Sequence, residues 1–172
     1  MEVEIHSPAL LYVVLIVVVV GVLALVGRAV TPTTGDGEML VLSPAYVATV
    51  RYLSAARDRL DDLDVVDEDL TGVLDADGGN IYTQGRDAEH AFSRALNAAR
   101  EIERDQSPLS LATLQTALYD AGGGYVEAAR ATLRWVSAPS EENRQGADTA
   151  LETARGLLAD SRQLQEGLWP EE

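Results

Sequence analysis

The segment Asp67–Asp75, with the sequence DEDLTGVLD, is the part of this chain whose residue types and spacing come nearest to a metal site. Oxygen-bearing side chains stand at its first, third, fifth and ninth positions, with glycine sixth and an apolar residue eighth, as in a helix-loop-helix calcium loop. The twelfth position, which should supply a bidentate glutamate, is Gly78. Carboxylates are also dense throughout residues 58–77. We therefore interpret this segment as a solvated acidic loop and predict no metal site.

Other residue types that carry chemistry are sparse. The chain has two histidines, His6 and His90, which lie far apart in sequence and have no evident partners, and it has no cysteine. The absence of cysteine excludes disulfides, thiolate metal sites and a cysteine nucleophile. The glycines at 122–124 have neither the adjacent lysine nor the preceding strand of a phosphate-binding loop. We predict no catalytic, cofactor-binding or metal-binding residue, and we expect the protein not to be an enzyme.

The charge of the chain is strongly acidic. It carries 28 acidic and 13 basic residues, all of the latter arginine, for a formal net charge of −15. Such a charge repels nucleic acid and opposes lying flat on anionic lipid. A lysine-free acidic composition is typical both of a GC-rich genome and of a salt-adapted proteome, and the sequence leaves both origins open.

The longest apolar run, ALLYVVLIVVVVGVLALVG over residues 9–27, has no charged residue and contains fourteen Val, Leu or Ile. At about 1.5 Å per residue, roughly 19 helical residues cover the ~30 Å hydrocarbon core of a bilayer. We predict a transmembrane helix over 9–29, between a short acidic tail (1–8) and a linker (30–42). A cleaved signal peptide is the main alternative, but the leader MEVEIHS lacks its positive charge. A buried core helix is a further alternative, although no polar side marks the run.

The orientation of the predicted membrane helix depends on one residue. Arg28 follows the apolar run, whereas Glu2 and Glu4 precede it and no arginine or lysine does. The positive-inside rule then places the C-terminal domain in the cytoplasm of a single-pass cell-membrane protein. An extracytoplasmic domain is the alternative.

Residues 43–168 show helical periodicity and no sustained two-residue alternation. We predict an all-α fold in which four to five helices pack as an antiparallel bundle. Ser43-Pro44 begins a helix of about 20 residues, and Ser140 caps the last helix. The acidic segment 58–77 is expected to be irregular, with at most one helical turn around Glu68 to Leu74. The remaining predicted helical stretches are 86–104, 109–121 and 125–136, and the last helix covers 141–166.

Gly122, Gly123 and Gly124 separate two of these stretches. Three glycines inside a helix cost about 3 kcal/mol relative to alanine, so we predict a break or sharp kink there. The apolar spacing stays in phase across the glycines, which favours one long helix as the alternative.

Part of the chain resembles a tetratricopeptide repeat. The residues that carry the resemblance within 112–139 are Tyr119, Gly123, Tyr125, Ala128 and Pro139. The second helix of another copy is suggested by Ala88, Phe92, Ala95 and Leu96. Gln115-Thr116 departs from the Leu-Gly pair of the repeat. The resemblance implies two short antiparallel helices and an interaction domain.

Trp169 is the one large apolar residue of the C-terminal tail, residues 169–172. It is expected to pack over the end of the bundle, or alternatively to dock on a partner. We predict a membrane-anchored scaffold or accessory protein that mediates protein–protein interaction. Its expected partners are membrane lipid, through the anchor, and an unidentified protein, but not nucleic acid. The alternatives are an extracytoplasmic sensing or ligand-binding bundle and a tetratricopeptide-like domain.

Overall fold

The computed structural model describes residues 43–76 and 80–168. Within these ranges the chain forms four α-helices, one short 3-10 turn and no strand, which confirms the all-α prediction. The elements are α2 (Pro44–Asp75), α3 (Ile81–Arg104), η1 (Leu109–Leu111), α4 (Ala112–Ser137) and α5 (Glu141–Leu168). No helix in this part of the chain is long and apolar enough to cross a membrane. The predicted transmembrane helix over 9–29 lies outside the described residues.

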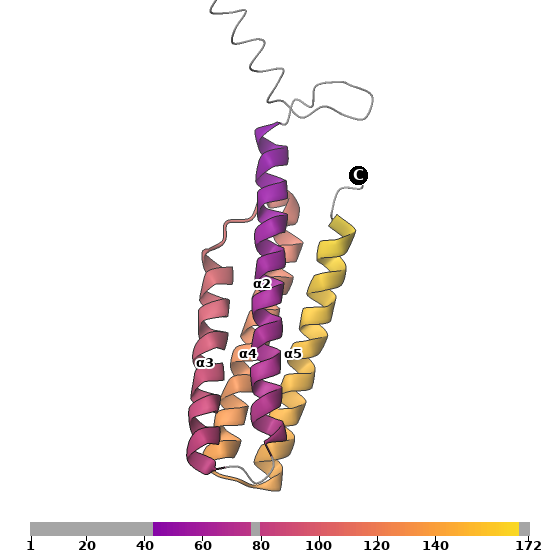
Figure 1. Ribbon diagram of the computed structural model, residues 1–172. Coiled ribbons are helices and arrows are strands. Elements are labelled where there is room, and N and C mark those ends of the chain that lie inside the picture. The colour runs from indigo at the N-terminus through magenta and orange to yellow at the C-terminus, as the bar shows by residue number, and fades with distance from the viewer. Residues whose placement is uncertain (1–42, 77–79, 169–172) are drawn as a thin grey trace, which may run out of the picture. The chain divides into compact units, whose positions relative to one another are not determined.

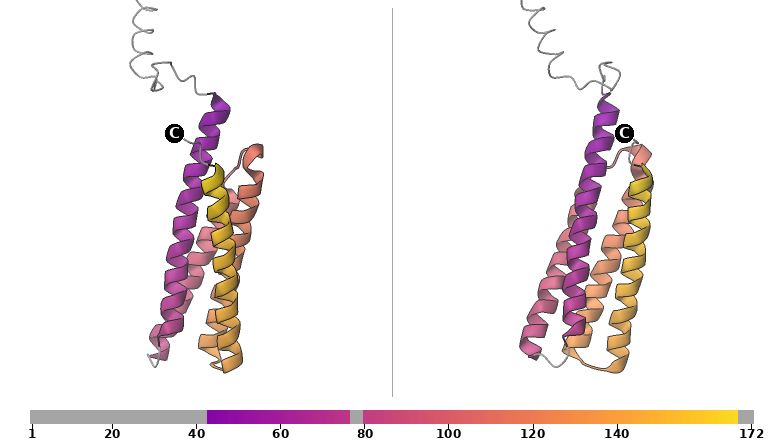
Figure 2. Two further views of the ribbon diagram at one scale, coloured as in Figure 1. Left: turned by 90° about the vertical axis from the view of Figure 1, so that its right-hand side faces the viewer. Right: turned by 45° about the vertical axis from the view of Figure 1, so that its right-hand side comes forward.

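The four helices pack side by side and alternate in direction (Figure 1). α2 and α4 contact each other, and each also contacts α3 and α5. α3 and α5 lie on opposite sides of this central pair, as Figures 1 and 2 show. The start of α2, the α3–α4 connection and the end of α5 therefore meet at one end of the bundle, which we call the Ser43 end.

α2 is much longer than predicted. It covers 32 residues to Asp75, so the prediction that the acidic segment becomes irregular after a helix of about 20 residues is wrong for residues 64–75. The reason is that buried apolar residues continue at three- and four-residue steps between the carboxylates, at Leu60, Leu63, Val66, Leu70 and Val73. Burial of this stripe stabilises the helix.

α4 passes without interruption through Gly122–Gly124, so the predicted break is wrong. A Cβ atom at Gly122 would lie 3.1 Å from Ile102 Cδ1 of α3, and one at Gly124 would lie 3.4 Å from Ala154 Cα of α5. The glycines thus allow α3 and α5 to approach α4 closely, and this packing offsets their low helix propensity. The two short helices implied by the tetratricopeptide resemblance are absent here, because residues 112–137 form one helix.

Capping side chains determine where α3 and α5 begin. Asn80 Oδ1 accepts a hydrogen bond from the Tyr82 backbone N–H at 2.9 Å, so α3 begins at Ile81 and not at the predicted Arg86. Ser140 Oγ accepts from the Asn143 backbone N–H at 3.1 Å, which confirms the predicted cap of α5.

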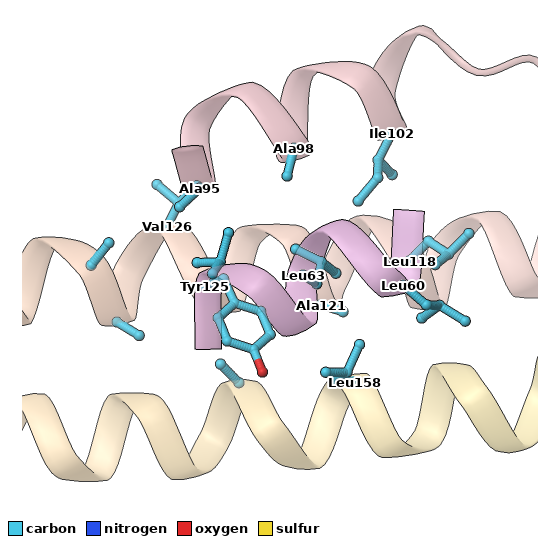
Figure 3. Packing of buried hydrophobic residues seen from close by; sticks show 14 of the residues in the cluster. Leu60, Leu63, Ala95, Ala98, Ile102, Leu118, Ala121, Tyr125, Val126 and Leu158 are labelled. Carbon is cyan, nitrogen blue, oxygen red and sulfur yellow. The ribbon is translucent and has the colours of Figure 1, made fainter. Parts of the chain in front are cut away.

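The core combines two kinds of packing (Figure 3). α3 buries mainly alanines, such as Ala95 and Ala98, against α4, whereas α2 contributes large side chains such as Leu60 and Leu63. Tyr125 of α4 is fully buried, and its hydroxyl points towards α5. Small residues therefore join α3, α4 and α5 closely, and leucines hold α2 against them.

Candidate functional site

A polar cluster of the described bundle lies where α2, α4 and α5 meet. Arg155 of α5 donates to both carboxylate oxygens of Asp67 on α2, at 2.8 Å from Nε and 3.0 Å from Nη2. Arg155 Nη2 also donates to Thr71 Oγ1 at 2.7 Å, and the buried hydroxyl of Tyr125 donates to Asp67 Oδ1 at 3.1 Å. The cluster joins three helices through one carboxylate.

These contacts shift the protonation equilibria of the cluster. Burial is the main cause that raises the pKa of the Tyr125 hydroxyl, and the charge of Asp67 raises it further. The hydrogen bond to Asp67 raises the pKa of the Arg155 guanidinium. Both shifts favour the protonated donor, so the cluster keeps its hydrogen bonds at neutral pH. Neither group is poised to exchange a proton, as a general acid or base would be.

Further ion pairs tie α2 to the rest of the bundle. Asp64 pairs with Arg162 of α5, and Asp69 Oδ2 lies 3.3 Å from Arg94 Nε of α3. Nearer the Ser43 end, Arg59 Nε donates to Asp105 Oδ2 at 2.8 Å. α2 is therefore held by charge to α3, to α5 and to the α3–α4 connection.

The predicted resemblance of Asp67–Asp75 to a calcium loop does not extend to the structure, because this segment is helical. Asp67 points towards α5 and Asp69 towards α3, where each meets an arginine. No group of metal-ligating side chains occurs among the described residues. The segment contributes ion pairs to the packing of α2 and is not a solvated loop.

The sequence did not reveal the arginine partners of these carboxylates. Asp64, Asp67 and Thr71 follow one another at three- and four-residue steps, which places them on one side of a helix. Arg155 and Arg162 are seven residues apart and share a side of α5. This matched spacing is a signal only within a continuous α2, whereas the sequence alone predicts a helix of about 20 residues from Ser43.

Other residues singled out from the sequence have simpler positions. The His90 side chain is 65% exposed, with Nδ1 4.0 Å from Asp69 Oδ2. His6 and Trp169 lie outside the described residues. Gly122 and Gly124 pack against neighbouring helices, as described above, and they form no phosphate-binding loop.

Large exposed apolar side chains gather at the Ser43 end. Leu109 of η1 is 96% exposed. The others there are Tyr46 and Val47 near the start of α2, Tyr119 of α4, and Leu164 and Leu168 at the end of α5. At the opposite end of the bundle, Tyr82 is 86% exposed and Ile81 is also exposed.

The comparisons with known proteins give no further identification. No protein-family model matches this chain, and no curated protein or solved structure matches it either.

Proposed function

We propose that this protein is a membrane-anchored, non-enzymatic scaffold or accessory subunit whose helical bundle binds a protein partner. Residues 9–29 would hold it in the membrane as a single-pass anchor, and the bundle would present its surface on one side. By the positive-inside rule that side is the cytoplasm, since Arg28 follows the apolar run.

The observation that carries this proposal is how α2 is held in the bundle. α2 is the first described helix after the predicted anchor in the sequence. Its carboxylates pair with arginines of two other helices. In addition, Arg59 pairs with Asp105 in the α3–α4 connection. These carboxylates of α2 and its Arg59 are thus engaged in ion pairs that attach α2 to the bundle. Such pairs fix register and orientation, as a tethered scaffold requires.

The end of the bundle opposite Ser43 supports a partner-binding role. Tyr82 and Ile81 are exposed there at the start of α3. Around them in the sequence carboxylates outnumber arginines, with Asp75, Asp77, Asp87 and Glu89 against Arg86. Exposed tyrosines are enriched in protein interfaces, and the acidic surroundings favour a partner with a basic surface.

Ligand sensing is the second candidate, favoured by a groove between α2 and α5. The groove has a volume of about 550 Å³ and its lining combines both signs of charge: Arg57, Leu60, Asp61, Asp64, Arg162, Gln165 and Glu166. A small zwitterionic ligand fits this lining by charge. Stabilisation of the bundle by such a ligand, lost in Arg57→Gln, would favour sensing over scaffolding.

The anchor and the partner surface are tested separately. The full chain should resist alkaline extraction from membranes, and removal of residues 1–29 should release it. A photoreactive phenylalanine analogue at Tyr82 should form a specific protein adduct, whereas the same analogue at Tyr119, another exposed tyrosine, should not form that adduct. Extraction of the full chain, or identical adducts from both positions, would contradict the proposal.

A further inference from the structure

We infer that the Ser43 end of the bundle rests against the lipid headgroup region of the membrane. This inference depends on the anchor proposed above and adds which surface of the bundle meets the bilayer. For the argument, the Ser43 end comprises residues 43–57, 106–119 and 163–168. Contacts across this end show that the three stretches are neighbours: the Tyr52 hydroxyl donates to Gln115, and a groove between α2 and α5 is lined by both Arg57 and Gln165.

Apolar exposure is the first observation. The Ser43 end holds six of the nine large exposed apolar residues of the described bundle, namely Tyr46, Val47, Leu109, Tyr119, Leu164 and Leu168. Transfer of a leucine as exposed as Leu109 out of water into an apolar environment is favourable. Tyrosine favours the membrane–water boundary, because its ring is apolar and its hydroxyl is polar. Exposed leucines and tyrosines gathered at one end of the bundle therefore favour its contact with the boundary between headgroups and acyl chains.

Charge is the second, independent observation. Residues 43–57 carry Arg51 and Arg57 but no acidic residue, and residues 106–119 carry no charge at all. Within 163–168 the only charged residue is Glu166. By contrast, the next part of α2, residues 58–75, has eight carboxylates and one arginine. Within the described residues, carboxylates are therefore sparser in these stretches than in the following part of α2.

This distribution matches the electrostatics of a bilayer. Anionic lipid repels carboxylates and attracts arginines near its surface. A chain with a net charge of −15 is repelled if it lies on its side, whereas the described residues 43–57, 106–119 and 163–168 together carry two arginines and one carboxylate. Asp105, the nearest carboxylate of the α3–α4 connection, is paired with Arg59. End-on contact is thus the orientation that both charge and apolar exposure favour.

The length of chain before the bundle is the third observation. The predicted span ends at residue 29, and the 13 residues of the linker 30–42 precede Ser43. Fully extended, such a linker reaches at most about 45 Å. The tether therefore keeps the Ser43 end near the bilayer at high effective concentration, so weak lipid contacts are sufficient to orient the bundle.

Site-directed spin labelling tests the inference, because the natural chain contains no cysteine. Four single-cysteine variants of the full chain are needed: Leu109→Cys and Leu168→Cys at the Ser43 end, Tyr82→Cys at the opposite end, and Val18→Cys in the predicted span. Each is labelled and reconstituted in vesicles of phosphatidylcholine and phosphatidylglycerol. Power saturation with oxygen and with a water-soluble nickel complex then reports the depth of each label.

The expected result is a graded order of depth. The label at 18 should favour oxygen most strongly, the labels at 109 and 168 should favour it moderately, and the label at 82 should behave as in water. If the labels at 109 and 168 match the label at 82 while 18 is deep, the anchor holds and this inference is overturned. If the label at 18 is in water, the anchor itself fails, and the inference fails with it.

Two further outcomes distinguish other occupants of the Ser43 end. Spin–spin broadening between labels at 109 would indicate a second copy of the chain and would overturn the lipid assignment. Adding Arg51→Glu should move the label at 168 towards water, whereas the matched change Arg86→Glu, near the opposite end, should not. Equal effects of the two charge reversals would contradict a local contact between the Ser43 end and lipid.

Discussion

Asp67 of α2 and Arg155 of α5, 88 residues apart in sequence, form a bidentate ion pair. Arg155 Nε lies 2.8 Å from Asp67 Oδ1, and Arg155 Nη2 lies 3.0 Å from Asp67 Oδ2. The carboxylate is mostly shielded from water, with 22% of its side chain exposed. It also accepts the hydroxyl of Tyr125, so one side chain connects three helices. The helix that follows the predicted anchor is thereby fixed to the helix that ends the bundle.

Removing the arginine of this pair should destabilise the bundle. Arg155→Met leaves the charge of Asp67 shielded from water without its cation, and we expect a loss of about 2 kcal/mol in the free energy of unfolding. Urea denaturation followed by circular dichroism measures it. Arg130→Met is the matched control, because among the described residues Arg130 pairs only with Glu127, on the exposed surface of α4, and its loss should cost under about 0.5 kcal/mol. A double change with Asp67→Asn should cost less than the two single changes together, since neither charge is then left alone.

The three glycines of α4 should respond differently to alanine. A Cβ atom at Gly123 meets nothing within 4 Å, so Gly123→Ala should stabilise the helix by about 0.5–1 kcal/mol. A Cβ atom at Gly124 would lie 3.0 Å from Leu157 Cδ1 and 3.4 Å from Ala154 Cα, so crowding should cancel or reverse that gain. Thermal unfolding of the two variants compares them directly. Equal stabilisation at both positions would show that α4 and α5 are not closely packed at Gly124.

The length of α2 could have been predicted, and the continuity of α4 could not. Leu60, Leu63, Val66 and Leu70 keep helical spacing through the acidic segment, and the dense carboxylates obscured this signal. Whether glycines break a helix depends on how closely a neighbouring helix approaches. That approach is decided by contacts such as Gly124 with Ala154, 30 residues further along the chain.

The helix caps and the ion pairs also differ in how far they could be predicted from the sequence. The cap at Ser140 is local in sequence, and its prediction is confirmed. The partners of Asp67 and Asp69 come from other helices, so they follow only from the order in which the helices pack. Sequence patterns therefore predicted helix type and most helix ends, whereas the polar cluster required the tertiary structure.

The stability of the bundle should fall in alkaline solution. Burial, together with the charge of Asp105, raises the pKa of Tyr52 from 10.0 to about 12. A tyrosine with a raised pKa in the folded state stabilises the fold fully below pH 10, and this contribution is lost as the pH rises from about 10 to 12. Tyr125 is shifted in the same direction, so its effect has the same sign.

The variant Tyr52→Phe isolates the contribution of Tyr52 to the pH dependence of stability from that of Tyr125. Because Tyr52 donates to Gln115, the change should cost about 1 kcal/mol at pH 8, and it should make the decline of stability above pH 10 shallower. Urea midpoints at pH 8, 10 and 11 for both proteins measure the two effects. Parallel declines in the two proteins would mean that Tyr52 does not titrate differently in the folded and unfolded states.

Calcium should not bind the acidic part of α2 specifically. Residues two positions apart in an α-helix are separated by about 200° around its axis. Asp67 and Asp69 therefore point in nearly opposite directions and cannot share an ion. Each also has an arginine partner, Arg155 and Arg94 respectively. Titration calorimetry at millimolar calcium should show no saturable heat for the natural chain. Saturable heat that disappears in Asp67→Asn would mean that this part of α2 unwinds to bind the ion, and it would contradict the role of these carboxylates as ties between helices.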